Sequence, residues 1–281
     1  MERVRSDLAV ECATDICTEG VRHCEVTCEG CRVFRVRIGS EEAARQIGKP
    51  QGHYVTLECE DIWTLDEVGE ANVRRALAVE LREMLSRACG GALPRCVLVA
   101  GLGNPEITPD GVGPATVARL RVTRGRVDAE FCGDACAICA LSVGVSAKTG
   151  LETLEFLRGI IREISPDALL VVDALAARDP ARLGRTVQLA DTGVCPGSGV
   201  NAARVALNKE TLGVPVVAIG VPTVVDSATL TRDALERAGC TQDVGEAVRH
   251  ARRFFVSPCE IDLLVRASGL LLSDAISRAL L

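Results

Sequence analysis

The sequence has 281 residues, of which 48% are hydrophobic and only 2% aromatic, and its formal net charge is −6. This length suits one large domain or two small ones, built around an aliphatic core. The acidic balance and the scarcity of aromatic stacking surface argue against nucleic-acid binding. No apolar run reaches the about 18–20 residues of a membrane span, and the first residues do not resemble a signal peptide, so we expect a cytoplasmic protein.

A small β element is predicted near the N-terminus. Residues 1–31 are polar, and we expect them to be irregular. Residues 33–38 alternate apolar and basic side chains, which is typical of a half-buried strand, and residues 54–58 supply its partner across a polar connection. The β element therefore covers about residues 32–60.

A long helix is predicted after this element. Thr64 and Glu67 have the spacing of a capping box, in which both side chains satisfy free N–H groups at a helix start. Apolar residues then recur at helical spacing as far as Leu85, and the pair Gly90 and Gly91 ends the helix. This stripe is typical of a core-facing helix and needs no functional interpretation.

The stretch from residue 96 to residue 114 is the most informative part of the chain. Residues 97–100 form a short apolar run typical of a buried strand, and Gly103 in the following turn permits a tight bend. Asp110 comes next, shortly before Pro114, which suits the first turn of a helix. A carboxylate is therefore expected above the C-terminal end of a strand, where open α/β sheets place their sites.

A second stretch repeats this arrangement. Residues 168–172 are another buried-strand run, and they end on Asp173. If the two strands are parallel neighbours, Asp110 and Asp173 converge above the sheet, and one of two facing carboxyl groups keeps its proton. Such a pair can activate water and protonate a leaving group. The alternative for each acid alone is a helix cap or a solvated loop residue.

The rest of the chain alternates strands with helices. We expect helices at residues 150–164 and 227–238, strands at residues 186–190 and 214–220, and a C-terminal helix opened by a second capping box at residues 257–260. This alternation predicts an α/β fold, with a mostly parallel sheet that is flanked by helices on both faces in three layers.

Several other kinds of site are disfavoured. None of the three histidines lies between residues 96 and 226, which argues against a histidine-activated nucleophile, although Cys195 and Ser198 lie in a glycine-rich loop. There is no HExxH zinc motif, and Glu106 replaces the third glycine of a dinucleotide fingerprint. Acids at or just after strand ends remain, with Asp191 and Asp226 as further examples.

Fourteen cysteines are many for a chain without a secretory signal, and thiols are expected rather than disulfides. Two triads share one spacing and could bind zinc or an iron–sulfur cluster. The alternative is incidental use of cysteine, which the scatter of the other eight favours, so we predict neither metal nor cofactor. The triads are Cys24, Cys28 and Cys31, and Cys132, Cys136 and Cys139.

Several motifs occur in an order that matches a known family. They are Gly101-Leu-Gly-Asn104, Thr108-Pro-Asp110, Leu120-x-Val-Thr-Arg124, Asp173-Ala-Leu-Ala-Ala-Arg178, Asp191-Thr-Gly193, Pro196-Gly-Ser-Gly-Val200, Leu212-Gly-Val-Pro215 and Ile219-Gly-Val-Pro-Thr-Val-Val-Asp226. With them the chain resembles the spore germination proteases, endopeptidases that degrade small acid-soluble spore proteins. The resemblance is dense over residues 96–230, clear over residues 4–11 and weak over residues 257–281.

This resemblance implies an aspartic-type endopeptidase with catalytic Asp110 and Asp173, and with Gly103, Asn104 and Asp191 as possible supporting residues. It implies small acid-soluble spore proteins as substrates and the spore core as the location. The family fold resembles that of hydrogenase maturation endopeptidases, which bind nickel, so the alternative is a metal-dependent processing peptidase that uses the same acids. A third hypothesis is a non-catalytic protein that binds metal through the cysteine triads.

The resemblance also implies a zymogen that cuts itself between Asp7 and Leu8. Residues 1–7 would then be a propeptide and residues 8–281 a single α/β peptidase domain. The segment from Asp7 to Glu11 has the order of the substrate sites: acid, large apolar residue, Ala, small residue, Glu. We expect it to be mobile and accessible, as chain termini usually are; the alternative is an edge strand. Family members are usually tetrameric, so a homo-oligomer is expected, although the stretch before the C-terminal helix is short here.

Overall fold

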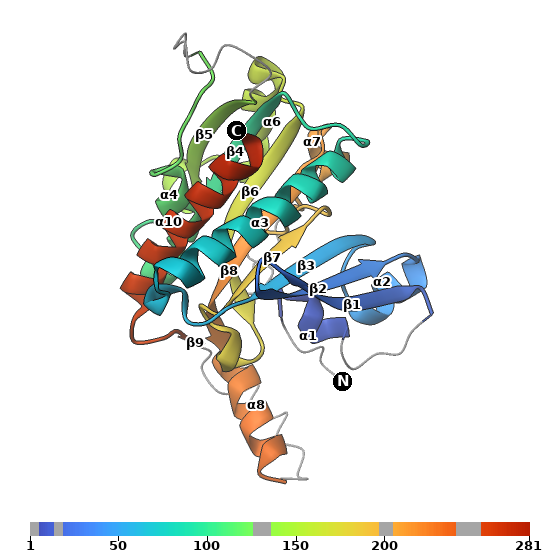
Figure 1. The fold of residues 1–281 in the computed structure, drawn as a ribbon, viewed down its shortest axis with the longest axis vertical. Coiled ribbons are helices and arrows are strands. Elements are labelled where there is room, and N and C mark those ends of the chain that lie inside the picture. Colours follow the sequence, from blue (N-terminus) through green and yellow to red (C-terminus); the bar gives the residue numbers. More distant parts are fainter. Residues whose placement is uncertain (1–5, 14–18, 126–135, 197–204, 240–253) are drawn as a thin grey trace.

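The computed structural model describes residues 6–13, 19–125, 136–196, 205–239 and 254–281 (Figure 1). Its helices are α1 (Ala9–Ala13), α2 (Glu41–Ile47), α3 (Glu67–Ala88), α4 (Val112–Val117), α5 (Ser146–Thr149), α6 (Thr153–Ile164), α7 (Lys209–Leu212), α8 (Ser227–Arg237) and α10 (Ile261–Leu280). Short 3-10 turns are η1 (Ile62–Thr64), η2 (Thr108–Asp110) and η4 (Pro180–Arg182). The strands are β1 (Val21–Cys28), β2 (Cys31–Ile38), β3 (Gly52–Glu58), β4 (Cys96–Leu102), β5 (Ala137–Gly144), β6 (Ala168–Ala177), β7 (Thr186–Ala190), β8 (Val216–Asp226) and β9 (Phe255–Val256).

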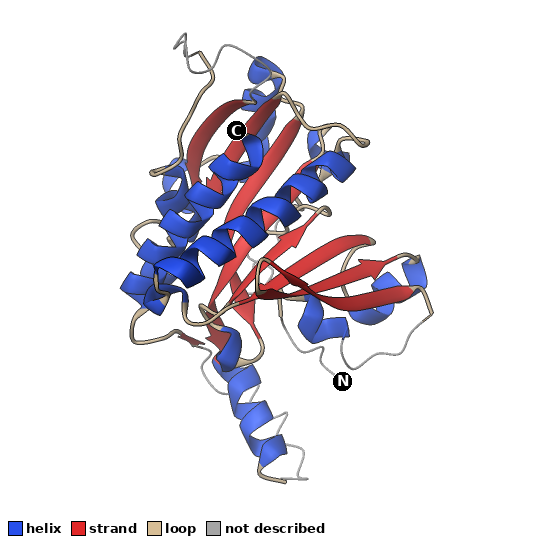
Figure 2. Ribbon diagram, in the orientation of Figure 1, coloured by secondary structure: helices blue, strands red, loops and turns tan. Residues whose placement is uncertain are grey.

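The described strands form one nine-stranded sheet in the order β1-β2-β3-β7-β8-β6-β4-β5, with β9 paired to β8. The strands β8, β6, β4 and β5 are parallel neighbours, whereas β1, β2, β3, β7 and β8 pair antiparallel (Figures 1 and 2). The predicted α/β class is confirmed, with a mixed sheet. The N-terminal β element is also confirmed, but it gains β1 and joins the main sheet through the pairing of β3 with β7.

Helices cover both faces of the sheet. The long helices α3 and α10 cross one face and pack on the largest apolar cluster, which collects inward-facing residues from β2 to β8 (Figure 2). On the opposite face, α6 and α7 cover the parallel half, and α1 and α2 cover the antiparallel half. Among the described residues, no helix has the length and apolar character that crossing a membrane requires.

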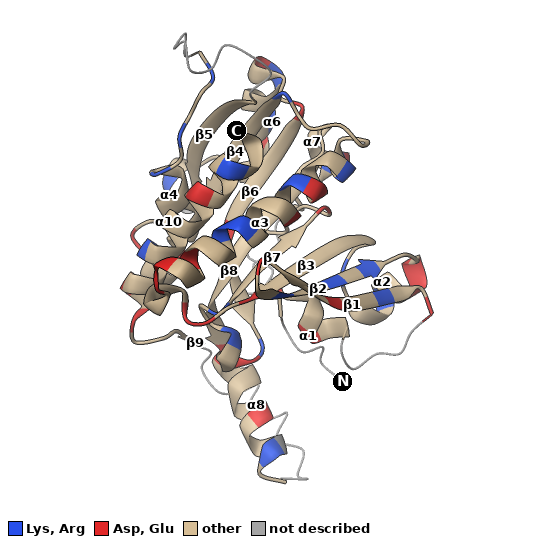
Figure 3. Cartoon of the chain, in the orientation of Figure 1, with Lys and Arg blue, Asp and Glu red and all other residues tan. Residues whose placement is uncertain are grey.

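The central strands form because their apolar runs are buried on both faces. Residues 97–100 of β4 and residues 168–172 of β6 are inaccessible to solvent. Parallel strands covered on both faces carry such near-continuous aliphatic sequences. On the outer half of the sheet, charges of both signs lie along β1, β2 and α3 (Figure 3), where ion pairs such as Arg35–Glu80 and Arg32–Glu25 link them.

Both predicted capping boxes are wrong, although both helices are confirmed. Thr64 lies in η1, and the residue that caps α3 is Asp66, whose side chain accepts a hydrogen bond from the N–H of Gly69. Leu65 is extended between the two elements, which moves the helix start beyond Thr64. The C-terminal helix begins at Ile261, and no side chain caps it.

The sequence predicts an irregular stretch over residues 1–31, and for the described part of that stretch this prediction is wrong. These residues contain α1 and β1, and the polar connection between β2 and β3 contains α2. Ser40 caps α2, and Gly48 ends it in a left-handed conformation. These elements lack a strong periodic pattern of their own. They are stabilised instead by packing on a shared apolar cluster with Ile38 and Tyr54.

Candidate active site

Asp110 is placed by a tight turn at the carboxyl end of β4. Gly103 has φ of +106°, and any side chain there would overlap the carbonyl oxygen of Asp110. The backbone N–H of Asn104 donates to Oδ2 of Asp110 at 2.6 Å. On the far side of the loop, the Thr223 hydroxyl donates to the carbonyl oxygen of Pro109 at 2.7 Å. The loop that carries Asp110 is therefore tied to the turn after β4 through Asn104 and to β8 through Thr223.

Asp173 lies on β6, next to the last residue that pairs with β4. Gly101 pairs with Val172, after which β4 no longer pairs with β6, while β6 continues to Ala177. The predicted strand end at Asp173 is therefore wrong, but the expectation that β4 and β6 are parallel neighbours is confirmed. Asp173 is 9% exposed, and its Oδ1 accepts a hydrogen bond from the N–H of Ala174 at 2.9 Å.

One cavity of about 500 Å³ brings three acids together: Asp7, Asp110 and Asp173 all line it. Burial, and after it the negative charges of Asp110 and Asp7, raise the pKa of Asp173 well above that of an ordinary carboxyl group. A carboxyl group with a raised pKa can act as a proton donor beside an ionised neighbour.

A row across three strands forms the floor of this cavity. Gln188 on β7 is in register with Gly220 on β8, which is in register with Asp173 on β6. Residues in register project from the same face of a sheet, and strands lie about 4.8 Å apart, so the glycine opens a gap of about 10 Å between the two polar side chains. A Cβ at Gly220 would lie 2.7 Å from Cγ of Leu175, so the gap depends on glycine.

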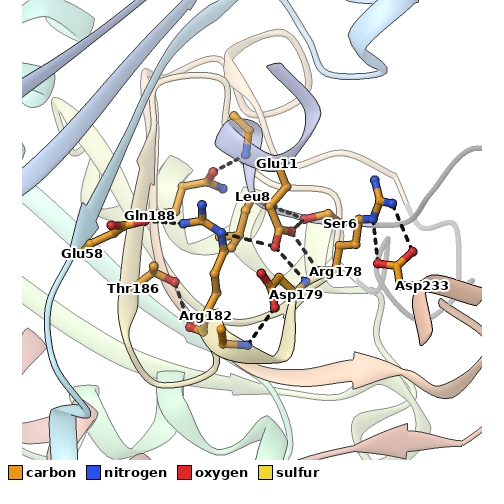
Figure 4. A network of polar contacts seen from close by, with 12 residues as sticks. Ser6, Leu8, Glu11, Glu58, Arg178, Asp179, Arg182, Thr186, Gln188 and Asp233 are labelled. Atoms are coloured by element: carbon orange, nitrogen blue, oxygen red, sulfur yellow. Dashed lines mark hydrogen bonds and ion pairs between the residues drawn. The ribbon is translucent and has the colours of Figure 1, made fainter. Parts of the chain in front are cut away.

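The N-terminal segment borders this cavity through Asp7, and Figure 4 shows how its neighbours Ser6, Leu8 and Glu11 lie beside Gln188 and Arg178. The N–H of Asp7 donates to the carbonyl oxygen of Ala176 at 2.8 Å, and the N–H of Ala176 donates to Oδ2 of Asp7 at 2.9 Å. Nε2 of Gln188 donates to the carbonyl oxygen of Asp7 at 2.7 Å, and Oε1 of Gln188 accepts from the N–H of Ala9 at 2.6 Å. Leu8 is completely buried.

These contacts change two expectations about the N-terminus. The segment is docked beside the cavity, and Leu8 is not accessible, because it is buried in one apolar cluster with Leu175, Ala177 and Leu183. The segment is not an edge strand either, because α1 begins at Ala9. The sequence analysis assigns no role to Gln188. The only sequence signal for it is that a polar residue stands between the buried residues Val187 and Leu189, so that its side chain points to the opposite face of the strand.

The other acids after strands lie outside the three-acid group. Asp191 accepts hydrogen bonds from the backbone N–H of His53 at 2.7 Å and pairs with Nδ1 of His53 at 2.8 Å. Its neighbours Ala190 and Thr192 line the cavity, but Asp191 itself does not. Asp226 ends β8, and its carboxylate accepts a hydrogen bond from the N–H of Ala228 at 3.2 Å.

The described members of the two cysteine triads lie in two regions, on β1 and β2 and at the start of β5. Cys28 and Cys31 face each other across the hairpin of β1 and β2. Burial, followed by the neighbouring Cys96 thiol, raises the pKa of Cys139 to about 11. Within the part of the chain that the structure describes, no group of three or more His, Cys, Asp or Glu side chains is arranged to hold a metal ion. Cys132 and Ser198 lie outside the described residues.

Comparison with known proteins gives a consistent family. The family model for germination protease matches residues 5–280. A germination protease from Caldanaerobacter subterraneus is 35% identical over 99% of this chain and 94% of its own length. One from Clostridium perfringens is 40% identical over 84% of this chain and 74% of its own length.

The family model and these relatives make the chain a hydrolase of the peptidase class. The chain belongs to the germination protease family. Among solved structures, a [NiFe] hydrogenase maturation protease, HycI from Thermococcus kodakarensis, is 18% identical over 70% of this chain and 98% of its own, with a TM-score of 0.37. A similarity at that level carries no conclusion about this chain.

Proposed function

We propose that this protein is an aspartic-type endopeptidase that degrades small acid-soluble spore proteins during germination, and that it is made as a self-cleaving zymogen. One observation carries the proposal: Asp110 and Asp173 line the same cavity as Asp7, the residue on the N-terminal side of the bond between Asp7 and Leu8. This is the bond at which the sequence resembles the family's cleavage sites.

The two aspartates take different roles in this proposal. Asp173, with its raised pKa, holds the proton, and Asp110 acts as the ionised base. Asp110 removes a proton from water, the water oxygen attacks the carbonyl carbon of the scissile bond, and the proton of Asp173 goes to the departing amide nitrogen. The C–N bond breaks, and proton exchange with solvent restores the pair.

Gln188 assists this step in the proposed mechanism. Its side-chain N–H already donates to the carbonyl oxygen of Asp7, the oxygen that gains negative charge when water attacks. A donor fixed at that position stabilises the transition state more than the ground state. The hydrogen bond from Ala9 to the other end of the same amide fixes the orientation of the Gln188 side chain.

The test is cleavage of a purified small acid-soluble spore protein by the processed enzyme. Asp110→Asn and Asp173→Asn should each lower the rate about 100-fold or more, the usual contribution of acid–base catalysis. The matched control is Asp274→Asn, which removes an acid on α10 that pairs with Arg74 at 2.9 Å, and it should keep normal activity. Near-normal cleavage by a folded Asp173→Asn variant would show that the acid pair is wrong.

A further inference from the structure

A second cavity, of about 610 Å³, lies on the outer half of the sheet, where β1, β2 and β3 face the C-terminal half of α3 (Figure 1). Its lining shares only Tyr54 with the lining of the acid-lined cavity, so the two are separate sites. Four arginines and two glutamates line it, which is an excess of positive charge in a chain whose net charge is −6. Cavities of this size are typical of small-molecule sites.

A row of three basic side chains crosses the sheet within this cavity. Arg22 on β1 is directly opposite Arg37 on β2, and Arg37 is directly opposite His53 on β3. Residues in register project from the same face of a sheet, and neighbouring strands are about 4.8 Å apart, so the row spans about 10 Å. His53 ends the row on the inner side, where its Nδ1 pairs with Asp191 at 2.8 Å.

The two acids of the cavity are already neutralised by other arginines. Glu80, with 2% of its side chain exposed, accepts hydrogen bonds from Nη2 of Arg35 at 2.6 Å and from Nε of Arg35 at 3.1 Å. Glu83 pairs with Arg87 at 2.6 Å. Within the described residues, by contrast, no ion pair joins either arginine of the row to a carboxylate. The excess positive charge of the cavity is therefore concentrated on the row.

The opposition of Arg22 and Arg37 is unfavourable in the free protein. Like charges directly opposite each other on antiparallel strands repel and destabilise the pair of strands. An anion bound between the two guanidinium groups would replace this repulsion with two attractive contacts. The position of the two arginines is thus explained better by a ligand than by the stability of the sheet.

We infer that this cavity binds a small, non-aromatic anion that carries one or two phosphate groups, held between Arg22 and Arg37. Each guanidinium presents donors in a planar fork that matches the oxygens of a phosphate group. Among the described residues of the lining, Tyr54 is the only Phe, Tyr or Trp, and it is 3% exposed, so no surface is offered on which a nucleobase could stack. A sugar phosphate or a diphosphate fits this description, and the inference does not depend on the proposed function.

The test is calorimetric titration of the folded full-length chain with pyrophosphate at constant ionic strength. The wild type should bind one equivalent in a saturable way. Arg22→Gln and Arg37→Gln should each weaken binding about tenfold or more, the usual effect of removing a charged hydrogen-bond donor. Arg37→Lys keeps the charge but loses the planar fork, so it should retain only part of the affinity.

Arg32→Gln is the matched control, because it removes the same charge from the same strand but from its opposite face. Alternate residues of a strand face opposite sides, and Arg32 pairs there with Glu25 at 2.9 Å and with Glu58 at 3.3 Å. This variant should bind pyrophosphate as the wild type does. The absence of saturable binding to the folded wild type, or equal weakening by Arg32→Gln and Arg37→Gln, would overturn the site and leave the proposed peptidase untouched.

Thermal unfolding without any phosphate present tests the premise of repulsion. Arg37→Gln should melt no lower than the wild type, because it relieves the opposition to Arg22 and breaks no ion pair of the described residues. Added pyrophosphate should raise the melting temperature of the wild type and have little effect on the variant, since only a bound ligand stabilises the folded state. A clearly lower melting temperature for ligand-free Arg37→Gln would contradict the inference.

Discussion

Replacing Asp173 by asparagine should stabilise the folded protein at neutral pH even though it removes activity. Asparagine keeps the shape of the side chain and the acceptor for the N–H of Ala174. It removes the need to bind a proton, which burial and the charges of Asp110 and Asp7 impose on the wild-type carboxyl group in the folded state. Keeping that proton above the ordinary carboxyl pKa costs the wild type free energy, and the variant has no such cost.

The size and the pH range of the effect follow from proton linkage. Between the ordinary carboxyl pKa of about 3.9 and the raised pKa of Asp173, the folded state binds more protons than the unfolded state, so wild-type stability falls as pH rises. Each unit of pKa elevation corresponds to about 1.4 kcal/mol, or roughly 3–5 °C in melting temperature for a domain of this size. The loss is complete once the pH exceeds the raised pKa.

Thermal unfolding of both proteins across pH measures this directly. The melting temperature of Asp173→Asn should exceed that of the wild type at pH 7, and the difference should shrink as the pH falls and vanish below about pH 3.9. Asp191→Ala is the control with the opposite sign, because it removes both hydrogen bonds of Asp191 to His53. A lower melting temperature for Asp173→Asn at pH 7 would refute the buried, destabilising carboxylate.

Three further predictions concern other positions. Gln188→Met should lower kcat about 100-fold with a smaller effect on KM, because it removes a donor aimed at the scissile carbonyl; an unchanged kcat would exclude that role. Gly103→Ala should displace Asp110 and abolish cleavage. Gly90 also has a positive φ, but no atom lies close to the position of its Cβ, so Gly90→Ala should lower stability only modestly. Equal losses of melting temperature and of activity in the two variants would contradict this prediction. Replacing Cys132, Cys136 and Cys139 together by alanine should leave folding and cleavage essentially unchanged. Stoichiometric loss of zinc or iron, together with unfolding, would refute this prediction.

The parallel centre of the fold could be predicted because its signals are local. Buried parallel strands are short aliphatic runs, and residues 97–100 and 168–172 are such runs. Each is followed by the acid that the sequence singled out. Because neighbouring parallel strands end at the same edge of the sheet, two local patterns were enough to predict that Asp110 and Asp173 lie in one place.

The rest of the site could not be predicted, because it depends on contacts between distant segments. Gln188 gains its position from the register of β7 with β8, and a single glutamine in a strand gives no local signal. Glu11 was recognised as part of a cleavage motif, but the backbone N–H groups that bind its carboxylate lie 167 and 168 residues away along the chain. The docking of Leu8 likewise depends on tertiary packing, which overrides the usual mobility of a chain end.

The measurement that tests the central claim most directly is the intact mass of the purified full-length chain after incubation at mildly acidic pH. The wild type should lose Met1 to Asp7 and expose a new N-terminus at Leu8, because Asp7 shares a cavity with the acid pair and its carbonyl oxygen already accepts a hydrogen bond from Gln188. Asp110→Asn should remain full length under the same conditions. A new N-terminus elsewhere, or equal processing of Asp110→Asn, would contradict the account.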